Sequence, residues 1–307
     1  MKKLIVKARR VPDKVRRLFR ICGGAVVNFH NVGAPNVYTE NLGVTMSAAA
    51  FEQRIAYLTA RFRVVPFSEI CQNKMDRTLA AVTFDDGYRC FLTEALPILE
   101  KYNCPAKMFL NADQVEGQLS WLNKLSAILA FSTPSQMKAF AARAVAQAKT
   151  AHPEQISFYR QNFEYPRTIE AVDETFGALD QAPPHGDLYL DADDIKKLMN
   201  HPLVEWGSHT ASHLPLEKLP LALQSEAILS GHNRLRPLLG KALTGFALPF
   251  GGPKLRTARL AQIVAEIDDV FVTASGERIF KQKVDALPEI QRLRGDDDFA
   301  RLKVQLK

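Results

Sequence analysis

Two adjacent carboxylates, Asp85 and Asp86, stand at the end of a hydrophobic run and are followed by Gly87. Neighbouring residues on an extended chain point in different directions, so the two side chains can do different work. One can bind a cation while the other moves protons. An aspartate here could instead cap a helix that starts near Tyr88. The pair is therefore a candidate site only in combination with other residues.

Two histidines, His209 and His213, lie four residues apart. At that spacing they can share one face of a helical turn and bind a single metal ion. Two imidazoles and a carboxylate such as Asp86 suit one catalytic divalent ion, Zn²⁺ first, with Co²⁺, Ni²⁺ or Mn²⁺ as alternatives. A metal held this way polarises a carbonyl group and lowers the pKa of its bound water to about 7.

The same ligand set also describes non-haem Fe(II) oxygenases. The second carboxylate, Asp85, separates the two hypotheses, because a hydrolase needs a base beside the water and an oxygenase does not. A third segment, Phe246–Gly252, runs from an apolar stretch into Pro249-Phe250-Gly251. Such a turn fixes the backbone direction and permits close approach to a ligand, although it also suits a plain strand-to-helix connection.

The elements that must position these residues alternate along the chain. Short apolar runs predict strands and amphipathic stretches predict helices, which together indicate an α/β fold with a parallel sheet, open or closed into a barrel. The candidate residues follow strand ends, where α/β barrels build their sites. The predicted strands are 25–29, 78–84, 106–110, 204–206, 244–248 and 270–273, and the predicted helices are 47–62, 88–102, 221–239 and 254–267. The interval from about 118 to 190 predicts a helical insertion.

The charge of the chain is concentrated at one end. The net charge is +7, but residues 1–20 hold nine Lys and Arg against one acid, Asp13, so the rest of the chain is close to neutral. This distribution argues against a nucleic-acid enzyme, which would spread positive charge along a groove. Residues 1–22 predict a basic amphipathic arm, either solvated or lying on anionic lipid. We expect no signal peptide or transmembrane helix, and a cytoplasmic location with peripheral contact at the inner membrane face.

Together the three segments resemble the polysaccharide deacetylase family, also called the NodB-homology or carbohydrate esterase 4 domain. Thr83-Phe84-Asp85-Asp86-Gly87 resembles its first motif, the stretch from His209 to His213 its second, and Leu248-Pro249-Phe250-Gly251 its third. The resemblance implies a distorted (β/α) barrel, here residues 23–307 as one domain carrying the insertion. It also implies one divalent metal and the removal of acetyl groups from sugars.

Carried over to this chain, the resemblance makes Asp86, His209 and His213 the metal ligands and Asp85 the base that activates water. The backbone N–H of Phe250, within the turn that includes Pro249 and Gly251, would stabilise the oxyanion.

The general acid of the family comes from a histidine near its C-terminus, and no histidine follows His232 here. Asn28-Phe29-His30-Asn31-Val32 resembles instead an early segment of the permuted poly-N-acetylglucosamine deacetylases, with Phe29 in place of Tyr. We therefore predict His30 as the acid, against the alternative that it only forms hydrogen bonds within a loop.

Two positions depart from the family pattern. Ala247 stands where an arginine often orients the base, and Pro288-Glu289-Ile290 replaces a Pro-Arg-Ile tail. Arg292 and Arg294 are the candidates to replace the missing arginine.

The expected function is a metal-dependent hydrolase that removes an N-acetyl group from an amino sugar of a glycan or a lipid-linked glycan precursor. The alternatives are a deformylase of a lipid-linked amino sugar and an inactive carbohydrate-binding protein.

Overall fold

The fold is that of a computed structural model of the 307-residue chain. The structure describes residues 24–73, 76–148, 152–250, 263, 267, 271–274, 289–296 and 298–306. The predicted arm at 1–22 and Gly251 lie outside these ranges, as does the predicted helix at 254–267 apart from Ile263 and Ile267.

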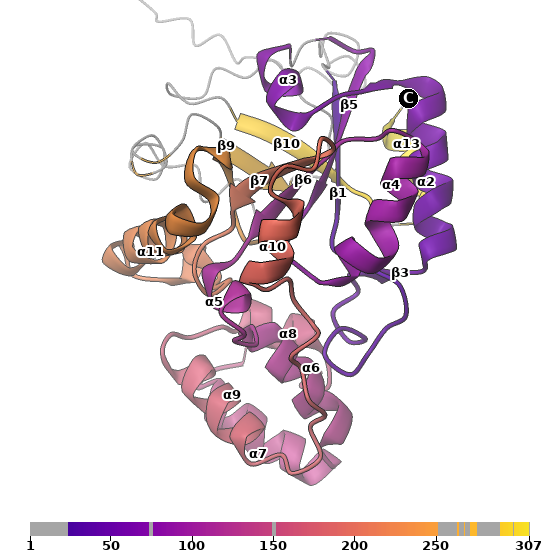
Figure 1. Cartoon of the computed structure of the whole chain (residues 1–307). Helices are drawn as coiled ribbons and strands as arrows, with labels where there is room; N and C mark the ends of the chain where they lie inside the picture. Colours follow the sequence, from indigo (N-terminus) through magenta and orange to yellow (C-terminus); the bar gives the residue numbers. More distant parts are fainter. Residues whose placement is uncertain are drawn as a thin grey trace, which may run out of the picture.

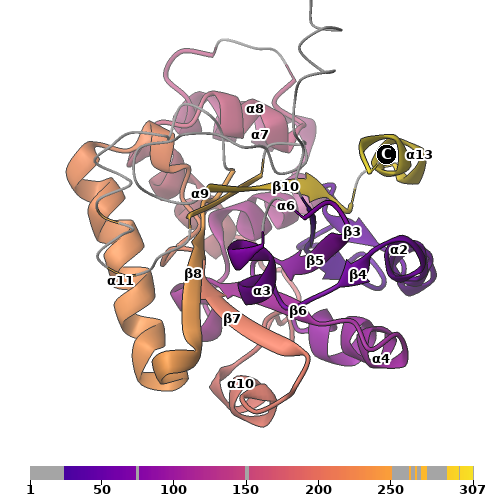
Figure 2. The ribbon, with the colours of Figure 1, turned by 90° about the horizontal axis from the view of Figure 1, so that it is seen from above.

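Eight parallel strands form one sheet, in the order β1-β10-β9-β8-β7-β6-β5-β4. Strand β1 pairs with both β10 and β5, which closes the sheet into a barrel (Figure 2). This arrangement confirms the predicted α/β fold. The strands are β1 (Ala25–Phe29), β4 (Arg63–Val64), β5 (Leu79–Phe84), β6 (Ala106–Leu110), β7 (Val204–Ser208), β8 (Leu243–Ala247), β9 (Phe271–Ala274) and β10 (Glu289–Arg294), with β2 (Asn31–Val32) and β3 (Thr45–Met46) pairing separately.

Strands β1, β5, β6, β7 and β8 are largely buried on both faces, as expected of parallel strands covered by helices. Every residue of β1, β5 and β6 is buried. Five buried residues in the described strands of this sheet are nevertheless polar: Asn28, Thr83, Lys107, Ser208 and Arg292. Strand β10 was not predicted, although its alternation of apolar and polar residues is typical of a half-buried strand. Its charged residue Arg292 is in fact fully buried.

Helices surround the barrel, as Figures 1 and 2 show. They are α2 (Ala48–Arg61), α3 (Phe67–Gln72), α4 (Leu96–Lys101), α10 (Ala192–Leu198), α11 (Leu221–Leu239) and α13 (Phe299–Gln305). Ser47 caps α2 as predicted, since its side chain accepts a hydrogen bond from the backbone N–H of Ala50. The stretch predicted as a helix over 88–102 begins instead as a π-helical turn, Phe91–Ala95, before α4. Pro97 explains the change, because proline lacks the N–H that a regular α-helical bond requires.

The segment between β6 and β7 is helical. It holds α5 (Ala112–Val115), α6 (Trp121–Phe131), α7 (Pro134–Ala144), α8 (Ile156–Gln161) and α9 (Arg167–Gly177), and α6–α9 gather at one end of the barrel (Figure 1). Their side chains share one hydrophobic cluster with Phe246 and Leu248 of the barrel. This sharing supports the proposal that residues 23–307 form one domain. No helix among the described residues is long and apolar enough to cross a membrane.

Candidate active site

The predicted site residues meet at the carboxyl ends of the barrel strands. A cavity of about 260 Å³ opens there, beneath the helices between β6 and β7. His30 follows β1, Asp85 and Asp86 follow β5, and His209 and His213 follow β7. The remaining lining residues are Asn28, Leu42, Val44, Tyr88, Ser120, Leu122, Ile156, Arg160, Leu248, Phe250, Arg292 and Arg294.

Asp86, His209 and His213 form a cluster suited to a metal ion, with one donor atom from each lying within 4.8 Å of the others. Asp86 Oδ1 lies 3.2 Å from Nε2 of His213 and 3.7 Å from Nε2 of His209. Donors on a tetrahedral Zn²⁺ with bonds of about 2.1 Å would stand roughly 3.4 Å apart. Asp86 Oδ1 is also buried without a hydrogen-bond partner. The residues present therefore fit a divalent cation.

The protonation states of these residues suit the same role. Burial lowers the pKa of His209 to about 4 and that of His213 to about 3, so both imidazoles are neutral near pH 7. Nδ1 of His209 lies 2.7 Å from the carbonyl oxygen of Ala247. This contact fixes the ring with its proton on Nδ1 and leaves Nε2 as an electron-pair donor, the arrangement found in metal-binding histidines. Burial raises the pKa of Asp86, a cost that a bound cation would offset.

The loops that carry the cluster have an uncommon backbone. Asp86, Thr210, His213 and Phe250 have φ angles of 70°, 74°, 54° and 56°, which are uncommon for residues with a side chain. Such conformations persist where the surroundings enforce them, and they concentrate at functional sites.

Two contacts hold the histidine loop in place. The indole N–H of Trp121 donates to the carbonyl oxygen of His213 at 3.0 Å. On the other side, the backbone N–H of Ala211 donates to the carbonyl of Ala227 in α11 at 3.0 Å. Gly231 of the same helix comes so close that a Cβ there would lie 2.3 Å from the backbone of Thr210. The loop is thus fixed between α6 and α11.

Asp85 is buried and held by three hydrogen bonds. Arg292 donates to both of its oxygens, at 2.7 and 2.8 Å, and the amide of Asn28 donates to Oδ2 at 2.9 Å. Burial alone would raise the pKa of Asp85, but the charge and hydrogen bonds of Arg292, together with the nearby His209 and His30, hold that pKa well below its usual value. Of the two arginines considered above, Arg292 is the one that contacts Asp85. Arg294 lines the cavity and donates to the carbonyl of Gly43.

His30 lies beside Asp85, with its Nε2 at 3.8 Å from Asp85 Oδ2. Its other nitrogen, Nδ1, lies 2.5 Å from a carboxylate oxygen of Asp296. Burial opposes a charged imidazole, but Asp296 more than offsets it and raises the pKa of His30 to about 9. His30 therefore bonds to a residue 266 positions away rather than within its own loop.

Sequence reasoning missed Asp296. Its only local signal is the acidic run Asp296-Asp297-Asp298, which is typical of a solvated turn.

The third motif contributes its aromatic ring to the site. The Phe250 ring packs 4.7 Å from that of His213, and Pro249 is buried. The role of the Phe250 N–H stays a prediction.

A family model described as polysaccharide deacetylase matches residues 72–267, which is more than half of the chain. The chain belongs to the polysaccharide deacetylase family. The resemblance of the motifs is thereby confirmed, and membership places the chain among hydrolases that remove acetyl groups from carbohydrate.

Solved structures share the fold at low sequence identity. The Streptococcus pyogenes deacetylase PplD, solved with acetate, is 14% identical with a TM-score of 0.59, and the match covers 93% of this chain and 98% of that one. IcaB from Ammonifex degensii is 18% identical with a TM-score of 0.55, covering 93% and 97%. A polysaccharide deacetylase from Bacillus cereus is 14% identical with a TM-score of 0.59, covering 93% and 69%. No curated protein sequence matches the chain significantly.

Proposed function

We propose that this member of the family is a metal-dependent amidohydrolase that removes the N-acetyl group of an amino sugar. One observation carries the proposal. A candidate metal cluster, an ionised carboxylate held by arginine and an imidazole held by a second carboxylate all line one cavity. These are the parts that hydrolysis of an amide requires.

Asp86, His209 and His213 would hold the metal, with Zn²⁺ favoured by the two nitrogen donors and Co²⁺, Ni²⁺ or Mn²⁺ as alternatives. A divalent metal bound there would polarise the acyl carbonyl and make water more acidic. The backbone N–H of Phe250, in the Pro249-Phe250-Gly251 turn, would donate to the oxygen that becomes negative as water adds.

Asp85 would accept the proton of the attacking water. Its two hydrogen bonds from Arg292 keep it ionised, and the bond from Asn28 fixes the oxygen that faces His30. A carboxylate with a low pKa is a weak base. It is adequate here because its neighbours hold it ionised and in one place while the metal makes water more acidic.

His30 would protonate the leaving nitrogen from Nε2. Asp296 holds Nδ1, so Nε2 is the nitrogen that lies near Asp85. The water oxygen bonds to the acyl carbon, the carbon–nitrogen bond breaks, and the proton on nitrogen completes the free amine. Acetate and an amino sugar are the products.

The substrate we propose is a glycan or a lipid-linked glycan precursor, met by a cytoplasmic enzyme at the inner membrane face. The basic residues of the first twenty positions support this proposal, because a basic segment is attracted to anionic lipid. The same machinery would remove a formyl group from a lipid-linked amino sugar. An inactive binding protein is disfavoured, since it would have no need of positive φ angles at Asp86 and His213 or of the buried donor atom Asp86 Oδ1.

Acetate release tests the proposal. Protein reconstituted with Zn²⁺ should release acetate from N-acetylglucosamine oligosaccharides, and Asp85→Asn should lower the rate by at least about a hundredfold. Asp187→Asn is the matched control, because its side chain is 97% exposed and paired only with Arg89 at the surface. Absence of acetate and formate release from every acylated amino sugar offered would contradict the assignment.

A further inference from the structure

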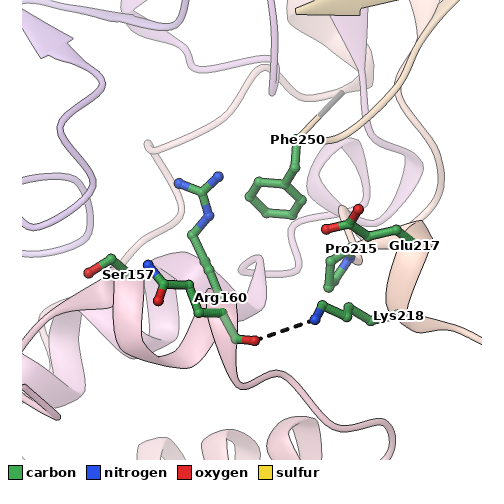
Figure 3. Close-up of a pocket in the computed structure, with 7 residues that line it drawn as sticks. Ser157, Arg160, Pro215, Glu217, Lys218 and Phe250 are labelled. Carbon is green, nitrogen blue, oxygen red and sulfur yellow. Dashed lines mark hydrogen bonds between the residues drawn. The ribbon is translucent and has the colours of Figure 1, made fainter. Parts of the chain in front are cut away.

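A second cavity, of about 410 Å³, lies beside the active site (Figure 3). It is lined by Ser157, Arg160, Gln161, Pro215, Glu217, Lys218 and Phe250. Two of these residues, Arg160 and Phe250, also line the active-site cavity. The two cavities therefore meet at this pair, and a substrate held in one can extend into the other.

The position of Arg160 links the second cavity to the metal cluster. Its guanidinium lies beside the Phe250 ring (Figure 3), with the guanidinium carbon 4.5 Å from the ring centre. That ring lies 4.7 Å from the ring of His213. Only these two contacts separate the cation from a predicted metal ligand. One sugar residue can span that interval, with its acyl group at the metal and a substituent at the guanidinium.

The charge around this junction is positive. Arg160 is exposed, and no salt bridge joins it to a carboxylate in the described part of the chain, although the charge of Glu217 acts on it. Lys218 adds a second cation, which donates to the carbonyl oxygen of Gln161 at 3.4 Å. Glu217 is the one carboxylate among the lining residues of this cavity, and Arg294 lines the adjoining one.

We propose, on the basis of the proposed function, that this cavity binds a phosphate group carried by the amino-sugar substrate. Arg160 is the principal contact and Lys218 the second. A guanidinium presents its donors in a fixed fork that matches phosphate oxygens, and an ammonium adds a point charge. A phosphate has enough oxygens for both cations, whereas a carboxylate would be occupied by the arginine alone. Nucleotide-linked and lipid-linked sugars both carry such a group.

The proposal assigns a role to the helical segment between β6 and β7. Arg160 belongs to α8, so that segment contributes charge to the site in addition to covering it. Selection of a phosphorylated substrate would therefore depend on α8 rather than on the barrel.

Calorimetric titration of the full chain tests the proposal. The probes are N-acetylglucosamine 1-phosphate and the uncharged methyl glycoside of N-acetylglucosamine. We expect the phosphate ester to bind about tenfold more tightly at low salt, and less so as salt screens the charges. Arg160→Gln should remove most of that preference and Lys218→Gln part of it, while affinity for the methyl glycoside stays the same. Arg61→Gln is the matched control, since Arg61 is also exposed and lies 4.7 Å from the ring of Tyr57.

The outcomes separate this proposal from the proposed function. Equal affinity for the two probes, or an equal loss of both in Arg160→Gln, would overturn the phosphate site even if acetate release is normal. A phosphate preference that depends on Arg160 would support it even if no acetate is released. Titration with a uridine diphosphate sugar and with a farnesyl diphosphate-linked sugar in micelles then distinguishes a nucleotide-linked from a lipid-linked substrate. If neither ligand binds in a way that depends on Arg160, the phosphate site is also overturned.

Discussion

Burial and charge pairing change the pKa of Asp85 in opposite directions. The net result is a lowered pKa, so the carboxylate is ionised. The side chain of Asp85 is 5% exposed and that of Arg292 is 1% exposed. Arg292 donates two hydrogen bonds to Asp85. A buried charge without a partner is costly, so each of these residues depends on the other. We therefore propose that Arg292 is a positioning residue that acts through Asp85.

Replacing Arg292 by lysine keeps a positive charge but loses the paired hydrogen bonds. Because Asp85 would then be free to shift, Arg292→Lys should lower kcat for acetate release by up to about a hundredfold with little change in KM. Metal content and the midpoint of thermal unfolding serve as the controls, because both report on the rest of the site. An unchanged kcat in a folded, metal-containing variant would show that Asp85 needs no such anchor.

The pair of His30 and Asp296 leads to a prediction about pH. Asp296 raises the pKa of His30 to about 9, so the acid form should persist through neutral pH and be lost as the pH rises through that value. Asp296→Asn removes the partner and should lower that pKa, which moves the alkaline fall of kcat/KM to lower pH. The measurement is the pH profile of kcat/KM for both proteins. If the two proteins lose kcat/KM over the same alkaline pH range, His30 is not an acid whose pKa is set by Asp296.

Membership of the candidate site could be predicted from the sequence where the motif is local. Asp85, Asp86, His209 and His213 lie within two short segments whose types and spacing identify them. Asp296 and the choice of Arg292 over Arg294 could not be predicted, because both depend on β10 lying beside β1. That contact joins residues more than 250 positions apart, and no local pattern encodes it.

At the scale of elements, helix α11 determines where the histidine loop can lie. Gly231 lets the helix contact the backbone of Thr210 directly, between the two histidines. Any larger residue at Gly231 must push the loop away, and with it the predicted ligands His209 and His213.

Gly231→Ala should therefore weaken metal binding, since its Cβ would lie 2.3 Å from a backbone atom that cannot yield without moving the loop. We expect at least about a tenfold loss of metal affinity, measured by competition with a chelator, which matches the effect of disturbing residues that support a metal ligand. Gly177→Ala is the matched control, because Gly177 also lies in a helix but has open space around it. Equal affinities in the two variants would contradict this role of α11.

The elements themselves were largely predictable, because hydrophobic runs and caps act locally. Strand β6 and helix α11 match their predicted bounds, and Ser47 caps α2. The π-helical turn before α4 was not predicted, since the apolar period continues through Pro97 and only the missing N–H changes the geometry.

At the scale of the whole molecule, closure of the barrel creates the site. Strand β1 pairs with β5 on one side and β10 on the other, which brings His30, Asp85 and Asp296 together. The alternation of strands and helices predicts a parallel sheet, but it leaves open whether the sheet closes.

The basic residues of the first twenty positions lead to a prediction about membrane binding. Deleting residues 1–20 removes nine basic residues and one acid, and should release the protein from vesicles that contain phosphatidylglycerol. Acetate release from a soluble oligosaccharide should be unaffected, because the predicted site lies elsewhere in the chain. Cosedimentation with the vesicles is the measurement. Unchanged cosedimentation would remove the main support for a membrane-bound substrate.

Metal content tests the central claim most directly, because it requires no assumption about the substrate. Elemental analysis of the purified chain should find about one divalent metal per molecule, as three protein ligands around one ion imply. The metal should be lost in His213→Ala and kept in Asp85→Asn, because only the first of these residues is a predicted ligand. No metal after reconstitution with zinc or cobalt, or equal loss from both variants, would contradict the account.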